Sequence, residues 1–478
     1  MIVQNFGNAL EQSSKNELGE PEPVTFERSN ISTVIPSPVP ENSAISSPPE
    51  VKKSDIKSSG LNYYSTDVQQ ATVKENVMVD ETFLISAINA LGATGGQIVL
   101  ESNLSIMKYD VYIPSNIVLS GANPNITIFL VGGNIRVATR AVNVTLKDLT
   151  IDASGLGEHY CFVDAQNTTN VILNNIDFYN YDGPGCLLVM GDQVVLNNLS
   201  FTNVTERFPI QIFGSNVTVR DCNSNDNSSW ALIAVGGGIS DITIVGNSAV
   251  NRPLLNANYG SVSTKNLSIE NNTVYFPNGT YGLLVMGGMG YSVQAPYQNV
   301  TVKGNFLRAG PGGWNAIAIY GLTTDALVMN NTVDMSLSGH NGIGISSGIN
   351  VTVMGNVVFG CTELTEGGIE VESNPMHNRN VGFSEDVTVV DNTVYNSSWG
   401  VYVRVMCPDH PNWNGTILLS KNILIENNFI FDCGVGVNLL YGDSIIVRNN
   451  SIASNVVPFA VNIAEVFNFT VTGNLGYP

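Results

Sequence analysis

Apolar and polar residues alternate along most of the chain in short segments that end at Asn, Asp or Gly. In Val351-Thr352-Val353, two apolar side chains point to one side of an extended strand and a polar side chain points to the other. Asn and Gly tolerate the left-handed backbone that a sharp corner requires. The pattern therefore predicts short β-strands joined at tight corners.

These segments repeat. NVTLKDLTI at 143–151 and NVTVKGNFL at 299–307 are two of thirteen copies of one motif, which start between Asn143 and Asn468 about 27 residues apart on average. One copy cannot bury its apolar row alone, whereas stacked copies can, because each strand pairs in parallel with its counterpart in the next coil. The sequence predicts an all-β fold of about thirteen or more stacked coils.

A different pattern precedes the coils. Asp80 can cap a helix and Gly92 can close it, and between them five apolar residues fall on one face: Phe83, Leu84, Ala87, Ile88 and Leu91. We expect a capping helix at about 80–91. Residues 1–60 hold seven of the twenty prolines and eleven serines, which predicts an extended arm or linker, with the β-helix covering 61–478.

The repeats and the helix before them resemble the right-handed parallel β-helix, or pectate-lyase-like, superfamily over roughly residues 80–478. The resemblance implies that fold, with the helix in the place of the family's amino-terminal cap. The last coil has no helix after it, and an uncovered parallel edge favours pairing with another chain, so a homo-oligomer or filament is expected.

Composition narrows the classes of function. The formal charge of −20, without a Lys/Arg cluster, argues against nucleic acid, and no 18-residue apolar stretch suggests a membrane span. Nineteen Asn-x-Ser/Thr sequons favour an extracellular or cell-surface protein with N-linked glycans, although Asn-Val-Thr is also what a coil of this type requires. Cys161 and Cys186, 25 residues apart, are either a disulfide or buried thiols.

A second strand in each coil carries the candidate chemistry. We align 342–346 (GIGIS) with 368–372 (GIEVE), 400–404 (GVYVR) and 434–438 (GVGVN), so that their apolar residues point inward. The remaining side chains then share one outer face: Ser346, Glu370, Glu372, Tyr402, Arg404 and Asn438. The same alignment places His340, Glu366 and Asp432 at the edge of this face, and two insertions beside it carry His377, Arg379 and Trp413.

Glu370 and Glu372 are about 6.6 Å apart along a strand, a separation at which inverting glycosidases place a water between acid and base. Crowding raises the pKa of one carboxylate and Arg404 keeps the other ionised. We expect Glu370, Glu372, His340 and Arg404 to be catalytic. Sugar contacts are expected from Tyr402, Asn438, Glu366, His377, Arg379, Trp413, Tyr320 and Asp432. The alternative is a solvated ion pair that contributes little.

The segment 339–346 (GHNGIGIS) resembles the Gly-His-Gly segment of polygalacturonase-type glycoside hydrolases with one residue inserted, although their paired Asp-Asp and Arg-Ile-Lys elements are not found. The resemblance favours a glycoside hydrolase that acts on polysaccharide along a lateral groove. If Arg404 or His377 instead removes a proton beside a uronate, the groove is that of a lyase, which usually needs Ca²⁺. No other cofactor and no metal site is predicted.

Two further functions remain open. The chain is either a non-catalytic surface or filament component, which assembles through its β-helix ends and its N-terminal arm, or an adhesin that binds glycans without cleaving them. The clustering of His and Glu favours an enzyme, and the incomplete family motif favours the other two.

Overall fold

The computed structural model describes residues 70–73 and 79–476, except 158–159, 165, 184, 205–206, 260–261, 278, 288–295, 365, 375–381, 406–418 and 454–460. The described residues all belong to one compact unit, Val68–Pro478. The predicted arm at 1–60 lies outside them.

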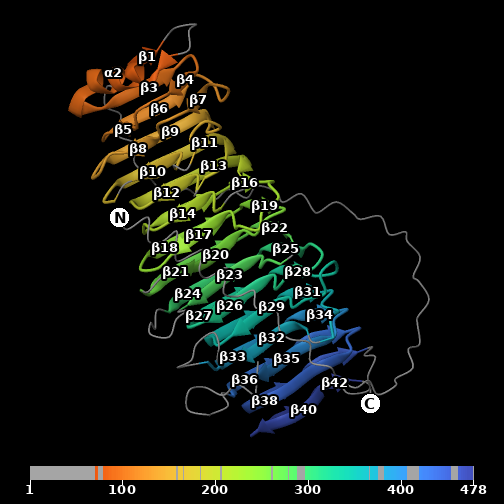
Figure 1. The fold of residues 1–478 in the computed structure, drawn as a ribbon. Helices are drawn as coiled ribbons and strands as arrows, with labels where there is room; N and C mark the ends of the chain where they lie inside the picture. The colour runs from red at the N-terminus through yellow and green to blue at the C-terminus, as the bar shows by residue number, and fades with distance from the viewer. Residues whose placement is uncertain are drawn as a thin grey trace, which may run out of the picture. The chain divides into compact units, whose positions relative to one another are not determined.

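The strands form three columns, in which each strand pairs in parallel with its counterpart one coil further along the chain. Figure 1 shows the coils stacked one after another from the helix at the orange end to the blue end. The predicted all-β, parallel β-helix fold is confirmed.

We call the columns the first, second and third face. The first face carries the candidate site and contains β5 (Val111–Ile113), β8 (Ile135–Val137), β10 (Phe162–Asp164), β12 (Leu187–Val189), β14 (Ile210–Ile212), β17 (Ile233–Gly236), β20 (Leu255–Tyr259), β23 (Leu283–Gly287), β26 (Ile317–Gly321), β29 (Ile343–Ser346), β32 (Gly367–Ser373), β35 (Trp399–Val405), the start of β38 (Val435–Arg448) and β40 (Val461–Phe467).

The second face contains β1 (Gln70–Val73), β3 (Gly96–Leu100), β6 (Ile117–Gly121), β9 (Val142–Asp152), β11 (Thr169–Tyr181), β13 (Asp192–Val204), β15 (Val217–Arg220), β18 (Ser240–Val245), β21 (Thr264–Glu270), β24 (Tyr297–Lys303), β27 (Thr323–Met329), β30 (Ile349–Met354), β33 (Glu385–Val390), β36 (Ser420–Glu426), the end of β38 and β41 (Thr470–Thr472).

The third face contains β2 (Val79–Asp80), β4 (Leu104–Ile106), β7 (Thr127–Leu130), the ends of β9, β11 and β13, then β16 (Asn223–Ser224), β19 (Ser248–Val250), β22 (Thr273–Phe276), β25 (Phe306–Ala309), β28 (Thr332–Asp334), β31 (Val357–Phe359), β34 (Thr393–Tyr395), β37 (Phe429–Phe431), β39 (Ser451–Ala453) and β42 (Leu475–Gly476).

The interior is one continuous apolar core made of the inward rows of all three faces. On the first face, Ile343, Ile369, Val401 and Val437 stack over one another and are fully buried. The alternation of apolar and polar residues therefore buries one row per strand, as predicted.

Two rows of residues, the inner one made of asparagine, mark one corner of nine successive coils. Asn330 and Asn427 have left-handed φ values of 54° and 56°, and Gly355 takes the same place in its coil at 63°. The next residue is an asparagine that turns inward. Asn331, for example, donates from Nδ2 to Asn356 Oδ1 at 2.9 Å, and its own Oδ1 accepts from Asn305 Nδ2 at 2.9 Å.

This buried ladder runs through nine coils and satisfies backbone groups as well as its own side chains. Its members are Asn247, Asn272, Asn305, Asn331, Asn356, Asn392, Asn428, Asn450 and Asn474. Each buried amide thus has partners, which removes the cost of burying a polar group.

The predicted cap is a helix, α2 (Glu81–Leu91). Asp80 caps it by accepting a hydrogen bond from Thr82 N at 3.0 Å, and Gly92 closes it with φ at 56°. Leu84, Ile88 and Leu91 are buried against the core. Phe83 was predicted on the same face, but it is 47% exposed, because the contact uses the narrower i, i+4, i+7 stripe.

Several sequence features have structural roles. Cys161, Cys186, Cys222, Cys361 and Cys433 are buried free thiols, so the disulfide alternative for Cys161 and Cys186 is wrong. Many sequon asparagines occupy left-handed corners, and Asn350 donates from Nδ2 to Asp325 Oδ1 at 2.6 Å. None of the helices in the described part of the chain is long and apolar enough to cross a membrane.

Candidate functional site

The first face places the predicted site residues in two adjacent columns. In the register of β29, β32 and β35, Gly344, Glu370 and Tyr402 pair in one column, and Ser346, Glu372 and Arg404 pair in the other. The predicted alignment of these three strands is confirmed. Their apolar neighbours enter the core, so both columns point away from it.

The predicted alignment of the fourth strand is wrong by two residues. Asn438 pairs with Tyr402 rather than lying in the column of Arg404, and Asn462 donates to Asn438 Oδ1 at 2.7 Å. Consequently Asp432 does not lie at the edge of the site. It occupies a left-handed corner with φ at 53°, like Asn396 one coil earlier, and its side chain is exposed.

The predicted outer face is not a solvated surface here. Glu370 is 2% exposed and Glu372 is 4% exposed, and Tyr402 and Asn438 are also buried. Burying two carboxylates costs free energy unless they are paired. The alternative of an ordinary solvated ion pair therefore does not describe this cluster.

Arg404 provides the pairing. Its Nε contacts Glu370 Oε1 and lies 3.5 Å from Glu372 Oε2. Its guanidinium also lies over the Tyr402 ring, 5.3 Å from the centroid, and the Trp399 ring packs against Tyr402 with centroids 4.2 Å apart. One cation from β35 is thus shared by both carboxylates of β32 and held from one side by aromatic rings.

The two carboxylates have different surroundings. Burial, followed by repulsion from Glu372, raises the pKa of Glu370 well above its ordinary value, although Arg404 opposes the change. Asn341 donates from Nδ2 to Glu370 Oε2 and accepts from Gly367 N at 2.6 Å. Burial would lower the pKa of Arg404, but Glu370 and Glu372 outweigh it and raise that pKa. Burial thus favours the protonated form of Glu370, and Arg404 stays charged. That Arg404 keeps the other carboxylate ionised stays a prediction.

Sequence reasoning missed the amides that hold the carboxylates. Asn341 positions Glu370 from the preceding coil, and Asn374 Nδ2 lies 3.5 Å from Glu372 Oε1. Asn341 stands directly before the aligned GIGIS segment, where the next two strands carry Gly367 and Trp399, so the repeat gives no signal for its contact.

An apolar cluster adjoins the carboxylates on the preceding coils of the first face. It consists of Leu284, Met286, Ala318 and Tyr320, with Tyr281 packed against it. Tyr320 pairs in register with Ser346 and is therefore in the column of Glu372 and Arg404. Its hydroxyl accepts from Asn315 Nδ2 at 2.7 Å, and burial raises its pKa well above the ordinary value. The predicted sugar-contacting Tyr320 is thus brought to the site as part of a packed aromatic wall.

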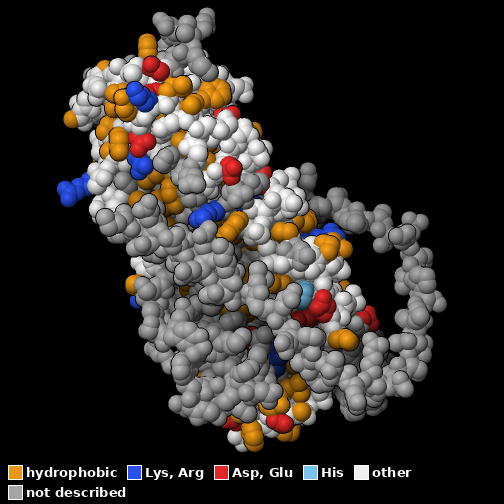
Figure 2. Space-filling view, viewed as in Figure 1, with side chains coloured by type: hydrophobic (Ala, Val, Ile, Leu, Met, Phe, Trp, Pro, Cys, Tyr) orange, Lys and Arg blue, Asp and Glu red, His pale blue; other side chains and the backbone are white. Residues whose placement is uncertain are grey.

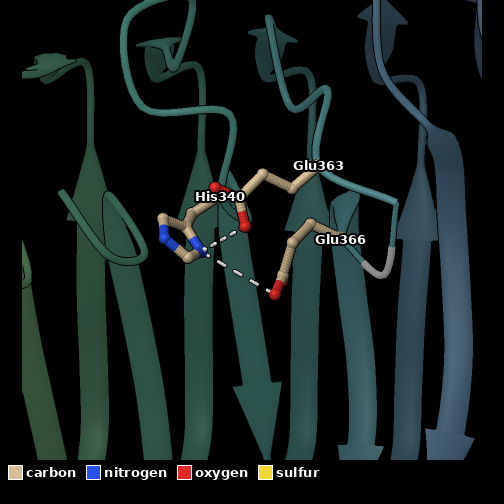
Figure 3. A group of neighbouring side chains, drawn as sticks. All are labelled: His340, Glu363 and Glu366. Carbon is tan, nitrogen blue, oxygen red and sulfur yellow. Dashed lines mark ion pairs between the residues drawn. The ribbon is translucent and has the colours of Figure 1, made fainter. Parts of the chain in front are cut away.

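The turns before β29 and β32 form the edge of the site. His340 Nδ1 lies 3.5 Å from Glu363 Oε2 and 3.7 Å from Glu366 Oε1, as Figure 3 shows. The contact with Glu366 raises the pKa of His340, and burial partly opposes it. Glu363 was not predicted. Among the residues that the structure describes, these three are the group whose ligand atoms lie close enough to hold a metal ion.

Three predicted sugar-contacting residues, His377, Arg379 and Trp413, lie outside the described residues. Of the predicted site, the described part therefore brings together Glu370, Glu372, Arg404, Tyr402, Tyr320 and Asn438, with His340 and Glu366 at the edge.

Comparison with known proteins supports the fold. Residues 254–408 match the family model for a right handed beta helix region, which agrees with the predicted hand of the coils. The comparison with curated proteins by sequence found no match.

Solved structures of similar fold come from proteins that differ widely in sequence. A mutant tailspike protein of E. coli bacteriophage HK620, solved with a hexasaccharide, has a TM-score of 0.51 and 14% identity over 82% of this chain and 76% of its own. The A-module of a mannuronan C-5 epimerase from Azotobacter vinelandii has a TM-score of 0.47 and 14% identity, over 84% and 96%. A PL6 family polysaccharide lyase from Pseudopedobacter saltans has a TM-score of 0.45 and 16% identity, over 84% and 93%. At these identities the similarity concerns the fold.

Proposed function

We propose that this chain acts on polysaccharide at the first face of its β-helix, as an extracellular or cell-surface glycoside hydrolase centred on Glu370, Glu372 and Arg404. The observation that carries the proposal is a pair of buried carboxylates that share one guanidinium on the side of the helix away from its core. Replacing such a buried ionic group by apolar residues usually costs nothing or stabilises a protein. Its presence is better explained by chemistry than by folding.

The environment of each group suggests its role. Burial and the neighbouring Glu372 raise the pKa of Glu370, which favours the protonated form that the general acid of a glycosidase needs. Glu372 is the partner carboxylate that acts on the sugar ring, either as nucleophile or through water. Glu370 contacts Arg404 Nε directly and Glu372 lies 3.5 Å from the same atom, so their nearest oxygens are at most about 6 Å apart, which fits the retaining geometry and not the expected inverting one.

The surroundings also suit a glycan. Sugar rings stack on aromatic faces, and Tyr281, Trp314 and Tyr320 form an edge-to-face group on the coils just before the carboxylates. The HK620 tailspike of similar fold, at a TM-score of 0.51, was solved with a hexasaccharide, so this fold occurs in a protein that binds a glycan.

A uronate lyase is the second candidate, because Arg404 lies beside two carboxylates on the first face. Glu370 and Glu372 carry the hard oxygen atoms that Ca²⁺ prefers. Bound Ca²⁺ would neutralise the substrate carboxylate, and Arg404 or His377 would remove the proton beside that carboxylate.

A polysaccharide panel distinguishes these functions. Neutral and acidic polysaccharides are incubated with the protein, with Ca²⁺ or with a chelator, while reducing ends and unsaturated-uronate absorbance are followed together. Hydrolysis predicts reducing ends without absorbance, lost in Glu370→Gln. The control is Glu426→Gln, because Glu426 forms an exposed ion pair with Arg448 on the second face.

The lyase predicts absorbance that requires Ca²⁺ and is lost in Arg404→Ala. If no polysaccharide yields a product, the enzymatic proposal is wrong. Glycan binding without a product would then support an adhesin, and large species that disappear when residues 1–60 are removed would support an assembling surface protein.

A further inference from the structure

We propose that His340, Glu363 and Glu366 form a binding site for a divalent transition-metal ion of the zinc type at the edge of the first face. The site is separate from the Glu370–Arg404 cluster and does not depend on the proposed hydrolase.

The three side chains converge on one point from two successive coils. His340 precedes β29, and Glu363 and Glu366 precede β32, and Figure 3 shows the two carboxylates directed at the same ring nitrogen. All the candidate ligand atoms lie within 4.8 Å of one another.

The distances fit a shared metal better than direct hydrogen bonds. His340 Nδ1 is 3.5 Å from one carboxylate and 3.7 Å from the other, whereas a good N–H···O bond is about 2.7–3.2 Å long. Ligands about 2.1 Å from a tetrahedral zinc ion are about 3.4 Å from one another. The imidazole is therefore already nearly at the spacing from each carboxylate that a tetrahedral ion imposes, and all three ligand atoms lie within 4.8 Å of one another.

The local backbone holds the ligands in this arrangement. Gly339 has a left-handed φ of 81°, and a Cβ there would lie 3.0 Å from Glu363 Cγ, so glycine lets the two turns approach. Glu363 N donates to Gly339 O at 3.0 Å, and Glu366 N donates to Glu363 O at 3.1 Å. The ligand set is thus tied to hydrogen-bonded turns on adjacent coils.

The ligand types and their exposure indicate the class of ion. One imidazole and two carboxylates suit Zn²⁺, Mn²⁺ or Fe²⁺, whereas Ca²⁺ prefers six to eight oxygens. Glu363 is 48% exposed and His340 is 26% exposed, so an ion can enter. The space-filling view shows acidic side chains beside a histidine at the surface (Figure 2). Three protein ligands leave a fourth position for water or a sugar hydroxyl.

Metal binding is tested with the full chain after treatment with a chelator and desalting. Zn²⁺ binding is measured by calorimetry, and Co²⁺ is used as a spectroscopic probe because its visible absorption reports tetrahedral coordination. We expect one ion per chain. His340→Ala and Glu366→Gln are each expected to weaken Zn²⁺ at least about 100-fold, since each removes a direct ligand.

Glu363→Gln tests the site without threatening the fold, because Glu363 is half exposed, and it is expected to weaken Zn²⁺ and to change the Co²⁺ spectrum. Glu426→Gln on the second face is the control and should bind as the unaltered chain does. The proposal would be overturned if the chain did not bind Zn²⁺, or if His340→Ala and Glu363→Gln both bound it as tightly as the unaltered chain does.

Discussion

Arg404 contacts the Glu370 carboxylate diagonally, from a position one coil further on and two residues along the strand. The position directly opposite Glu370 is taken by Tyr402, whose ring lies under the guanidinium. Arg404 pairs in register with Glu372 and so reaches both carboxylates at once. The cluster is therefore a three-membered group in which one guanidinium serves two carboxylates, so removing Arg404 leaves buried acid without a counter-ion.

Arg404→Ala should destabilise the fold strongly at neutral pH. It leaves Glu370 and Glu372 buried without a counter-ion, and breaking a buried pair typically costs about 3–5 kcal/mol. Urea unfolding measures the loss.

Arg448→Ala is the control for this prediction, because Arg448 forms an exposed pair with Glu426. Its effect should be far smaller. If Arg404→Ala and Arg448→Ala lowered the free energy of unfolding equally, burial of the Arg404 cluster would not make it more important for stability than the exposed pair.

Asp164 should make stability depend on pH in the acid range. It is fully buried on β10, where burial raises its pKa to about 6, although Thr168 and Gly191 donate hydrogen bonds to it. A pKa raised in the folded state favours the protonated form, so this contribution is fully present below about pH 4 and lost by about pH 6. The difference between 3.8 and about 6 corresponds to about 3 kcal/mol.

The comparison with Asp164→Asn isolates this contribution from the other titrating groups. The difference in unfolding free energy between the two proteins, measured from pH 4 to 7, should change in favour of the variant as pH rises. A constant difference over this range would show that Asp164 does not titrate there.

The buried asparagine ladder should be more sensitive than the corner row. Asn331→Ala removes its hydrogen bonds to Asn305, Asn356 and Val302, and leaves buried donors and acceptors unpaired. Each unpaired buried group costs about 1–3 kcal/mol, so thermal unfolding should occur at clearly lower temperature.

The control is Asn330→Gly in the corner row, at an exposed left-handed position with φ at 54°. Glycine accepts this conformation, so little stability should be lost. If both variants melt together, the ladder is not a main source of stability.

Trp314 should contribute to glycan binding if the first face is the binding surface. It stands three residues before β26, as His340 does before β29. The Trp314 side chain is 42% exposed, and its ring packs against Tyr281 with centroids 5.1 Å apart. Trp314→Ala should weaken oligosaccharide binding up to about tenfold by calorimetry. Phe429→Ala, which removes an exposed ring from the third face, should not. A stronger effect of Phe429→Ala would place the glycan elsewhere.

The fold could be predicted because its physical basis repeats in the sequence. Rows such as Ile343, Ile369 and Val401 fix both the inward face and the register, and a corner residue follows each row. The register failed at Asn438, since Gly434 and Gly436 are equivalent anchors for the alignment. An alignment that is wrong by two residues keeps the same side chains pointing inward, so the alternation of apolar and polar residues cannot reveal the error.

The candidate site was predicted less completely. Alternation shows that Glu370 and Glu372 leave the core, but it does not show that they are buried, because that depends on segments distant in sequence. The asparagines of the repeat were all assigned to turns, whereas the second of each pair, as in Asn330-Asn331, is a buried ladder position. Side-chain contacts between coils, such as that of Asn341 with Glu370, have no periodic signal.

The central claim is that Glu370 is the proton donor of a polysaccharide-cleaving site. The most direct measurement compares cleavage and binding of one oligosaccharide by the unaltered chain and by Glu370→Gln, whose amide keeps the shape of the side chain. Loss of general acid catalysis should lower the cleavage rate by about 10²–10⁴-fold, with the dissociation constant nearly unchanged. Cleavage at an undiminished rate by a folded Glu370→Gln variant would contradict the account.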